Sequence, residues 1–204
     1  MIPASRTWLL LAGLLLACAT PKQAWVETTP PEVFVELLPR SAELSLDGKP
    51  LGTGGRTTAV PDLSRVYVFR ATAPGFTAVE KSEKGVSLAG GRLGLVLRPE
   101  GFGEARRLEL DDGAGLAAAA ALLEKKGKHE LALEYAERAV EVAPELALGH
   151  RVASDAAMTL ERRKRAIQAY SAYLAAAPDA PDRAAVARKV EGLRGDLTIP
   201  PVVR

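Results

Sequence analysis

Two stretches in the C-terminal half of the chain repeat each other: ALEYAERAVEVAP at residues 132–144 and AIQAYSAYLAAAP at residues 166–178. They are offset by 34 positions. The segment that contains them, residues 115–195, is rich in Ala, Leu, Glu, Lys and Arg, which are strong helix formers. A fixed period of roughly 20–50 residues is typical of stacked supersecondary units. The sequence therefore predicts a C-terminal region of repeated helical hairpins.

These stretches resemble the tetratricopeptide repeat, a helix–turn–helix unit with a period of about 34 residues. The inter-helix turn of that family is matched at Gly127-Lys128-His129. Its signature positions are matched by small residues, a tyrosine and prolines: Ala132, Ala139, Pro144, Ala166, Tyr170 and Pro178. The resemblance implies repeats at 113–146 and 147–180.

The second copy departs from the family at two points. Tyr173 replaces an expected alanine, and Glu161-Arg162-Arg163 lies where the first copy has its glycine turn. A further helix is expected from Pro181 to Leu193, with apolar residues along one face. Its polar outer face suits a capping helix, which such arrays need for solubility.

In the repeat family, the first helices of successive repeats line a groove that accepts a peptide or a partner helix. Carried over by position, the resemblance implies eight candidate partner-groove residues in this chain. They are Ala117, Ala121, Glu124, Lys125, Leu148, Arg151, Asp155 and Met158. A protein partner is therefore expected, although two repeats and a cap that only pack on the rest of the chain remain an alternative.

Residues 33–99 have a different pattern, with β-branched and apolar residues alternating with polar ones between Gly and Pro turn signals. Apolar and polar residues alternate from Ala42 to Asp47, which predicts a strand with one apolar face. Asp47-Gly48 readily forms a tight hairpin turn. The segment from Arg65 to Ala73 predicts a central strand buried on both faces, and Val86 to Leu88 predicts a short strand. Together these signals predict a small antiparallel β-sandwich, and the whole chain is expected to be an α+β multidomain protein.

The β region resembles the PEGA domain, a small β-sandwich module found mostly in bacterial envelope and surface proteins. The resemblance lies in three segments: Leu38 to Gly48, Leu51-Gly52 and Ala73-Pro74-Gly75-Phe76. The family has no catalytic residues to carry over. The resemblance therefore implies a structural or interaction module.

The N-terminus contains an apolar run at residues 8–17, directly followed by Cys18, the single cysteine of the chain. The run is shorter than the roughly 20 residues of a membrane-spanning helix and is typical of a secretory signal. Leu15-Leu16-Ala17-Cys18 resembles the lipobox of bacterial lipoproteins, which implies cleavage of residues 1–17 and acylation of Cys18 by fatty acids such as palmitate. An ordinary signal peptide and a buried cytosolic thiol are the alternatives.

Three further segments complete the expected domain organisation. Residues 18–32 contain three prolines and several polar residues, which favour an extended tether. Residues 100–114 form a junction rich in Gly and charge, and residues 196–204 form a tail. Ala19 follows the cysteine where the family's inner-membrane retention signal has Asp, so the resemblance implies anchoring at the periplasmic face of the outer membrane.

Composition and motifs argue against several classes of function. The chain has 27 basic and 25 acidic residues, so nothing suggests the clustered basic footprint of a nucleic-acid-binding protein. The two histidines, His129 and His150, are expected to pack in the repeats, and no His/Cys pattern predicts a metal site. No nucleophile or acid–base motif is present. The sequence predicts a chain that is not an enzyme and has no cofactor and no metal.

The expected function is that of a cell-envelope lipoprotein acting as a protein–protein interaction scaffold. One alternative is an assembly factor of an envelope machine, such as a pilus, secretion or motility complex. Another is a cell-wall or glycan-binding module, in which the β region contacts peptidoglycan.

Overall fold

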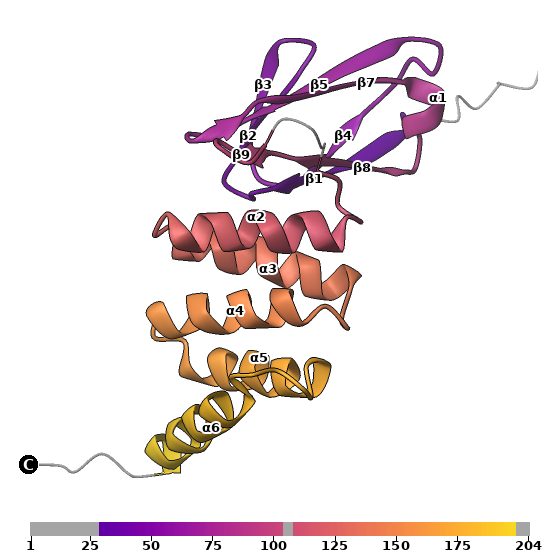
Figure 1. Ribbon diagram of the computed structural model, residues 1–204. Coiled ribbons are helices and arrows are strands. Elements are labelled where there is room, and N and C mark those ends of the chain that lie inside the picture. The colour runs from indigo at the N-terminus through magenta and orange to yellow at the C-terminus, as the bar shows by residue number, and fades with distance from the viewer. Residues whose placement is uncertain (1–28, 104–107, 199–204) are drawn as a thin grey trace, which may run out of the picture.

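The computed structural model describes residues 29–103 and 108–198. Within them, the chain is α+β, with a β-sheet region followed by a helical region (Figure 1). Cys18 and the apolar run before it lie outside the described residues, as do most of the expected tether and the end of the expected tail.

The β region consists of two main sheets and a short ribbon. One sheet has the strand order β4-β1-β8, the other has the order β3-β2-β5-β7, and β6 pairs with β9. The strands are β1 (Glu32–Leu38), β2 (Glu43–Leu46), β3 (Lys49–Thr53), β4 (Arg56–Ala59), β5 (Val66–Thr72), β6 (Phe76–Thr77), β7 (Val79–Lys84), β8 (Arg92–Val96) and β9 (Arg98–Pro99). The largest buried side chains come from facing strands of both main sheets, including Val35, Phe69 and Leu95.

Three details differ from the sequence-based expectations. The sheets are mostly antiparallel, but β1 and β8 pair in parallel, because a long excursion through the second sheet separates them in sequence. β5 is central, yet it buries one face only, with Tyr67, Phe69 and Ala71 inside and Arg70 outside. The segment around Val86 forms a helical turn, α1 (Gly85–Leu88), instead of a strand.

The hairpin between β2 and β3 has the expected Asp47-Gly48 turn. Both residues have positive φ, at 49° and 79°, as a two-residue turn between twisted strands requires. The Asp47 carboxylate also accepts a hydrogen bond from the backbone N–H of Val68 at 3.0 Å and pairs with Arg65 at 2.7 Å. The turn residue therefore also ties the hairpin to the central strand.

The helical region contains α2 (Gly113–Lys125), α3 (His129–Val142), α4 (Ala147–Thr159), α5 (Arg163–Ala176) and α6 (Arg183–Thr198). The bounds of α2 and α3 reappear in α4 and α5 after a shift of 34 positions. The turns repeat as well, since Lys128 N donates to Leu123 O at 2.9 Å and Arg162 N donates to Ala157 O at 2.8 Å. The two helical hairpins are thus structurally equivalent.

The equivalence extends to the turn where the second copy lacks glycine. Gly127 has a φ of 71°, and Glu161 adopts a similar left-handed φ of 57°. This conformation is strained for a residue with a β-carbon, at a cost of order 1–3 kcal/mol. The packing of the hairpin therefore imposes the turn geometry in spite of the residue at that position.

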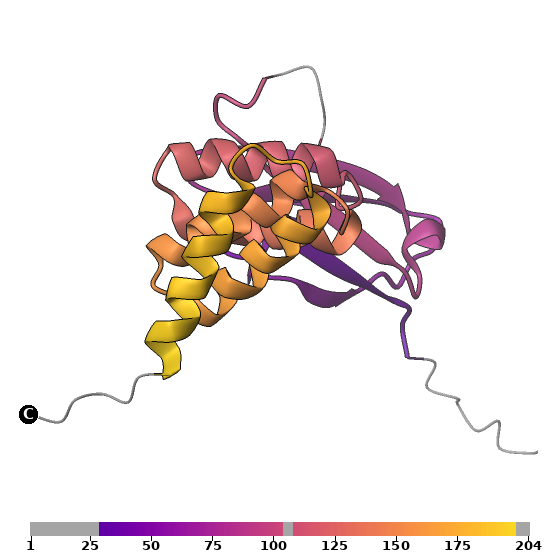
Figure 2. The ribbon, with the colours of Figure 1, turned by 60° about the horizontal axis from the view of Figure 1, so that its bottom comes forward.

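The helices stack in layers against the sheet of β1 and β8. In Figure 1, α2 and α3 lie directly beneath this sheet, α4 and α5 form the next layer, and α6 crosses the far end. Figure 2, which views the molecule from the α6 end, shows the helical layers overlapping the sheet. Buried side chains of both regions form one contiguous cluster. The β region therefore covers the face of the first hairpin on which a preceding hairpin would stack.

Tyr135 of α3 is the centre of this interface. Its side chain is fully buried, and its hydroxyl lies 2.5 Å from the Leu97 carbonyl and 3.1 Å from the Leu38 carbonyl, toward which it donates. Leu97 N also donates to Leu38 O at 2.8 Å, continuing the parallel pairing of β1 and β8. Burial raises the pKa of the Tyr135 hydroxyl, and the charge of Glu134 raises it further, so the group stays protonated as a donor.

Other contacts surround Tyr135. Its ring packs against Phe76 with a centroid distance of 6.1 Å. Glu134, its neighbour on α3, accepts a hydrogen bond from the backbone N–H of Arg40 at 2.6 Å. Arg138, one turn further on, donates to the carbonyl of Leu110 at 3.1 Å. One face of α3 is therefore fixed to the β region and to the junction from Glu134 to Arg138.

We expect Tyr135→Phe to destabilise the whole chain by about 1–3 kcal/mol, because a buried carbonyl loses its donor while the packed volume hardly changes. Urea unfolding, followed at the sheets and at the helices by hydrogen exchange, measures this. Tyr67→Phe is the matched control, since the Tyr67 hydroxyl accepts from the N–H of Asp62 in an exposed loop at 3.0 Å. An equal effect of both variants, or none of Tyr135→Phe, would contradict this role for Tyr135.

Candidate functional site

One face of α4 carries the second half of the predicted partner groove. Leu148, Arg151, Asp155 and Met158 are spaced by three or four residues, so they lie along one side of the helix. The Leu148 side chain is 44% exposed, whereas Met158 is partly buried against the core. α4 packs beside α2, which carries the first half of the groove.

On α2, the predicted residues have different environments. Ala117 is fully buried and Ala121 is half-buried against the core. Glu124 lies 2.9 Å from Nδ1 of His129, so it interacts within its own hairpin. Lys125 is exposed. The floor of this half is therefore built of alanine, and of the four residues Lys125 is the one that is open to solvent.

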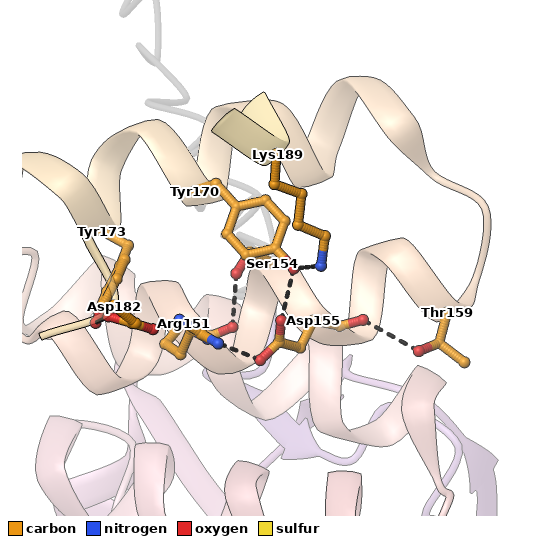
Figure 3. Close-up of polar contacts among 8 residues, drawn as sticks. All are labelled: Arg151, Ser154, Asp155, Thr159, Tyr170, Tyr173, Asp182 and Lys189. Atoms are coloured by element: carbon orange, nitrogen blue, oxygen red, sulfur yellow. Dashed lines mark hydrogen bonds and ion pairs between the residues drawn. The ribbon is translucent and has the colours of Figure 1, made fainter. Parts of the chain in front are cut away.

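Arg151 and Asp155 form part of an internal polar network that joins α4, α5 and the start of α6 (Figure 3). Arg151 Nε donates to Asp155 Oδ2 at 2.9 Å, and its Nη1 contacts Asp182. The guanidinium also lies over the ring of Tyr173, 5.3 Å from its centre. The Tyr173 hydroxyl in turn donates to Asp182 Oδ1 at 2.6 Å. These contacts fix the segment that precedes α6 to the face of α4.

A second branch of the network starts at Asp155. Its Oδ1 accepts a hydrogen bond from the Tyr170 hydroxyl of α5 at 2.6 Å. Lys189 of α6 lies over the Tyr170 ring, 4.5 Å from its centre, and also contacts the hydroxyl oxygen. The Lys189 side chain thus links α6 to α5, because its ammonium group contacts both the ring face and the hydroxyl group of Tyr170.

The network changes the acid–base properties of its members. Burial raises the pKa of Tyr170, and the hydrogen bond to Asp155 raises it further. The Tyr173 hydroxyl and the Arg151 guanidinium hold the pKa of Asp182 below its usual value, although partial desolvation opposes them. At neutral pH the two tyrosines are therefore donors, and Asp182 is a charged acceptor.

Sequence reasoning placed Arg151 and Asp155 on the groove but did not connect them with Tyr173, Asp182 or Lys189. A comparison of the two repeats contains a sign of this network. Tyr170 and Tyr173 occupy positions where the first hairpin has Ala136 and Ala139. Two tyrosines in place of two alanines indicate hydroxyl groups that need partners, and the repeat places them beside α4.

A hollow lies between α3 and α5, the second helices of the two hairpins, with residues of α4 in its lining. It has a volume of about 350 Å³ and an apolar floor that includes Val140, Ala153 and Ala169. Ala169 is equivalent to Tyr135 of the first hairpin. Where Tyr135 fills its space and holds the β region, the small side chain of Ala169 leaves a shallow groove.

The two histidines lie in the hairpins. His150 is buried, and its Nε2 lies 2.7 Å from the carbonyl of Pro144. His129 begins α3 next to Glu124. In the part of the chain that the structure describes, no group of three or more His, Cys, Asp or Glu side chains is arranged to hold a metal ion. Within residues 29–103 and 108–198, no helix combines the length and apolar character that crossing a membrane requires.

No protein-family model fits the sequence, and no curated protein is significantly similar to it.

We expect Asp182→Asn to weaken the attachment of α6 in a pH-dependent way. Because the folded-state pKa of Asp182 lies below the usual 3.8, its carboxylate stabilises the fold above that value. This contribution is lost as pH falls through the lowered pKa. The difference in urea midpoint between wild type and Asp182→Asn should therefore be largest near neutral pH and shrink in strong acid.

The matched control is Asp179→Asn, which removes an exposed carboxylate from the same inter-helix loop. It should leave the midpoint unchanged throughout the titration. A midpoint difference for Asp182→Asn that stays constant down to strongly acidic pH would show that the carboxylate charge is not what holds α6.

Proposed function

We propose that this chain is a non-enzymatic lipoprotein of the bacterial cell envelope, in which a PEGA-like β region carries a short tetratricopeptide-like array that binds a protein partner. The lipid anchor at Cys18 follows from the lipobox-like Leu15-Leu16-Ala17-Cys18. The periplasmic face of the outer membrane is the proposed location.

The repeated geometry of the helices supports the family part of this proposal. Two hairpins with the same bounds, shifted by 34 positions, have the same turn hydrogen bonds and a third, single helix behind them. Such arrays use the side of the stack as a binding surface, because their two ends are closed by caps. Here α6 covers one end, and the β region covers the other.

The side of the stack on α4 is the surface that best fits a partner. Among the described side chains of residues 113–195, Leu148 is the one large apolar group that is exposed. It lies one turn before the charged pair of Arg151 and Asp155, which the surrounding tyrosines hold in place. An apolar anchor beside a pre-positioned charged pair suits an amphipathic helix or peptide.

The anchor is tested by metabolic labelling with a clickable palmitate analogue. We expect wild type to incorporate the label and Cys18→Ser to lose it completely, since the chain has no other cysteine. The label is a sharper readout than fractionation, because the apolar run at residues 8–17 remains in an uncleaved precursor. Label on Cys18→Ser would contradict acylation at this position.

The partner surface is tested with Leu148→Glu. A photo-crosslinking residue at exposed Lys125, at the C-terminal end of α2, should capture one defined protein in cells, and Leu148→Glu should abolish that adduct. Leu148 is preferred to Arg151 because Arg151 also holds Asp155 and Asp182 within the fold. The control is Ala175→Glu on the exposed side of α5. Equal capture by both variants, at unchanged thermal midpoints, would exclude this face.

A further inference from the structure

Three exposed apolar side chains gather at one end of the β region. They are Leu63, Val66 and Val86, which are 41%, 48% and 64% exposed. Among the described residues, two other large apolar side chains reach comparable exposure, Phe34 and Leu148. We call the three residues the apolar tip.

The apolar tip is a fixed surface, because backbone hydrogen bonds join its segments. Val86 N donates to the Leu63 carbonyl at 2.9 Å, and Gly85 N donates to the Arg65 carbonyl at 2.8 Å. A β-carbon on Gly85 would come within 2.4 Å of the Asp62 carbonyl, so α1 sits directly on this loop. The exposed apolar groups are therefore presented in one arrangement.

The chain enters the fold at the same end. The Pro31 carbonyl accepts from Val60 N, and the Glu32 carbonyl accepts from Gly90 N, each at 2.7 Å. In Figures 1 and 2 the start of β1 and α1 lie at the same end of the sheets in both views. Residues 19–28 separate Cys18 from the first described residue. At about 3.5 Å per residue, that distance is at most about 40 Å.

We propose that the apolar tip rests on the lipid bilayer in which Cys18 is anchored. This inference depends on the lipid anchor of the proposed function. A short tether keeps the tip at a high local concentration near the surface, so even a weak contact is populated. Aliphatic side chains on a rigid loop gain free energy by entering the interfacial layer, in the manner of a shallowly inserted anchor.

The polar neighbours of the tip are compatible with this contact. Lys84, which pairs with Val66 across β5 and β7, is exposed, and its long side chain can reach lipid phosphates while its stem lies along apolar surface. Asp62, the acidic residue beside Leu63, accepts hydrogen bonds from the N–H and hydroxyl of Ser64 at 2.9 and 2.7 Å. Because of these bonds, the Asp62 carboxylate interacts within its own loop.

In this orientation the helical stack lies alongside the bilayer and is set back from it, because the end of the sheets that carries α1 extends beyond the helices in both Figure 1 and Figure 2. α6 lies at the opposite end of the molecule from the sheets (Figure 1). The face of α4 would then be held clear of the lipid headgroups, where a protein partner has access to it.

The test uses the full acylated chain on vesicles of phosphatidylethanolamine and phosphatidylglycerol. Val86→Cys is labelled with an environment-sensitive fluorophore, which is selective because acylation consumes the Cys18 thiol. Exposed Arg188 on α6 provides the matched control as Arg188→Cys. Lipids carrying a shallow spin label then act as quenchers. We expect a blue shift and strong quenching at position 86, and neither at position 188.

Co-flotation of the protein with the vesicles is measured first. Protein that fails to float indicates that the anchor is missing, which overturns the proposed function and this inference with it. Protein that floats with an unquenched label at position 86 overturns this inference alone. Adding Leu63→Ser and Val66→Ser to Val86→Cys should abolish the quenching without changing the thermal midpoint. In cells, crosslinking of a photo-reactive residue at position 86 to an envelope protein, together with no quenching by lipid on vesicles, would overturn the inference and assign the tip to a protein partner.

Discussion

The buried hydroxyl of Tyr135 is the contact on which the arrangement of the two regions depends. It donates toward the carbonyls of Leu97 and Leu38 at the point where the parallel pairing of β1 and β8 ends. A sheet that stops inside a protein leaves backbone acceptors that need donors, and each unsatisfied one costs free energy. A helix that supplies the donor is thereby fixed in register and orientation. The shared core of sheets and helices follows from this one placement.

The far end of the stack is closed by a different kind of interaction. There, charge and hydrogen bonds hold α6, with Arg151 between Asp155 and Asp182 and with Lys189 over the Tyr170 ring. The contrast has a physical basis. The first hairpin shares a buried core with a sheet, so a neutral donor lies at the centre of that interface, and Glu134 and Arg138 contribute polar contacts around it. The single helix α6 buries Val186, Val190 and Leu193, and partly exposed ion pairs supplement this packing. Because both ends are occupied, the sides of the stack are what remains for a partner.

The proposed lipid anchor would orient the apolar tip and the α4 face relative to the membrane. The chain enters the β region beside the apolar tip, while the helices stack beneath the sheets and are set back from that end. A lipid anchor at Cys18 would bring the sheets to the bilayer and hold the α4 face away from it. The β region then has two roles that need no active site: it caps the helical stack through Tyr135, and it sets the distance and orientation of that stack relative to the membrane.

The sequence by itself determined the local structure. Alternation from Ala42 to Asp47 and the Asp47-Gly48 pair specified a hairpin, because period and turn chemistry act over a few residues. The repeat of 34 positions specified two equivalent helical hairpins. The tertiary structure alone decided the parallel pairing of β1 with β8, the helical turn at Gly85 and the left-handed Glu161, since each is imposed by distant packing. It also decided that Arg151 and Asp155 bond to Tyr170, Tyr173 and Asp182. Ion pairs across helices depend on where α6 docks, and no sequence period encodes that.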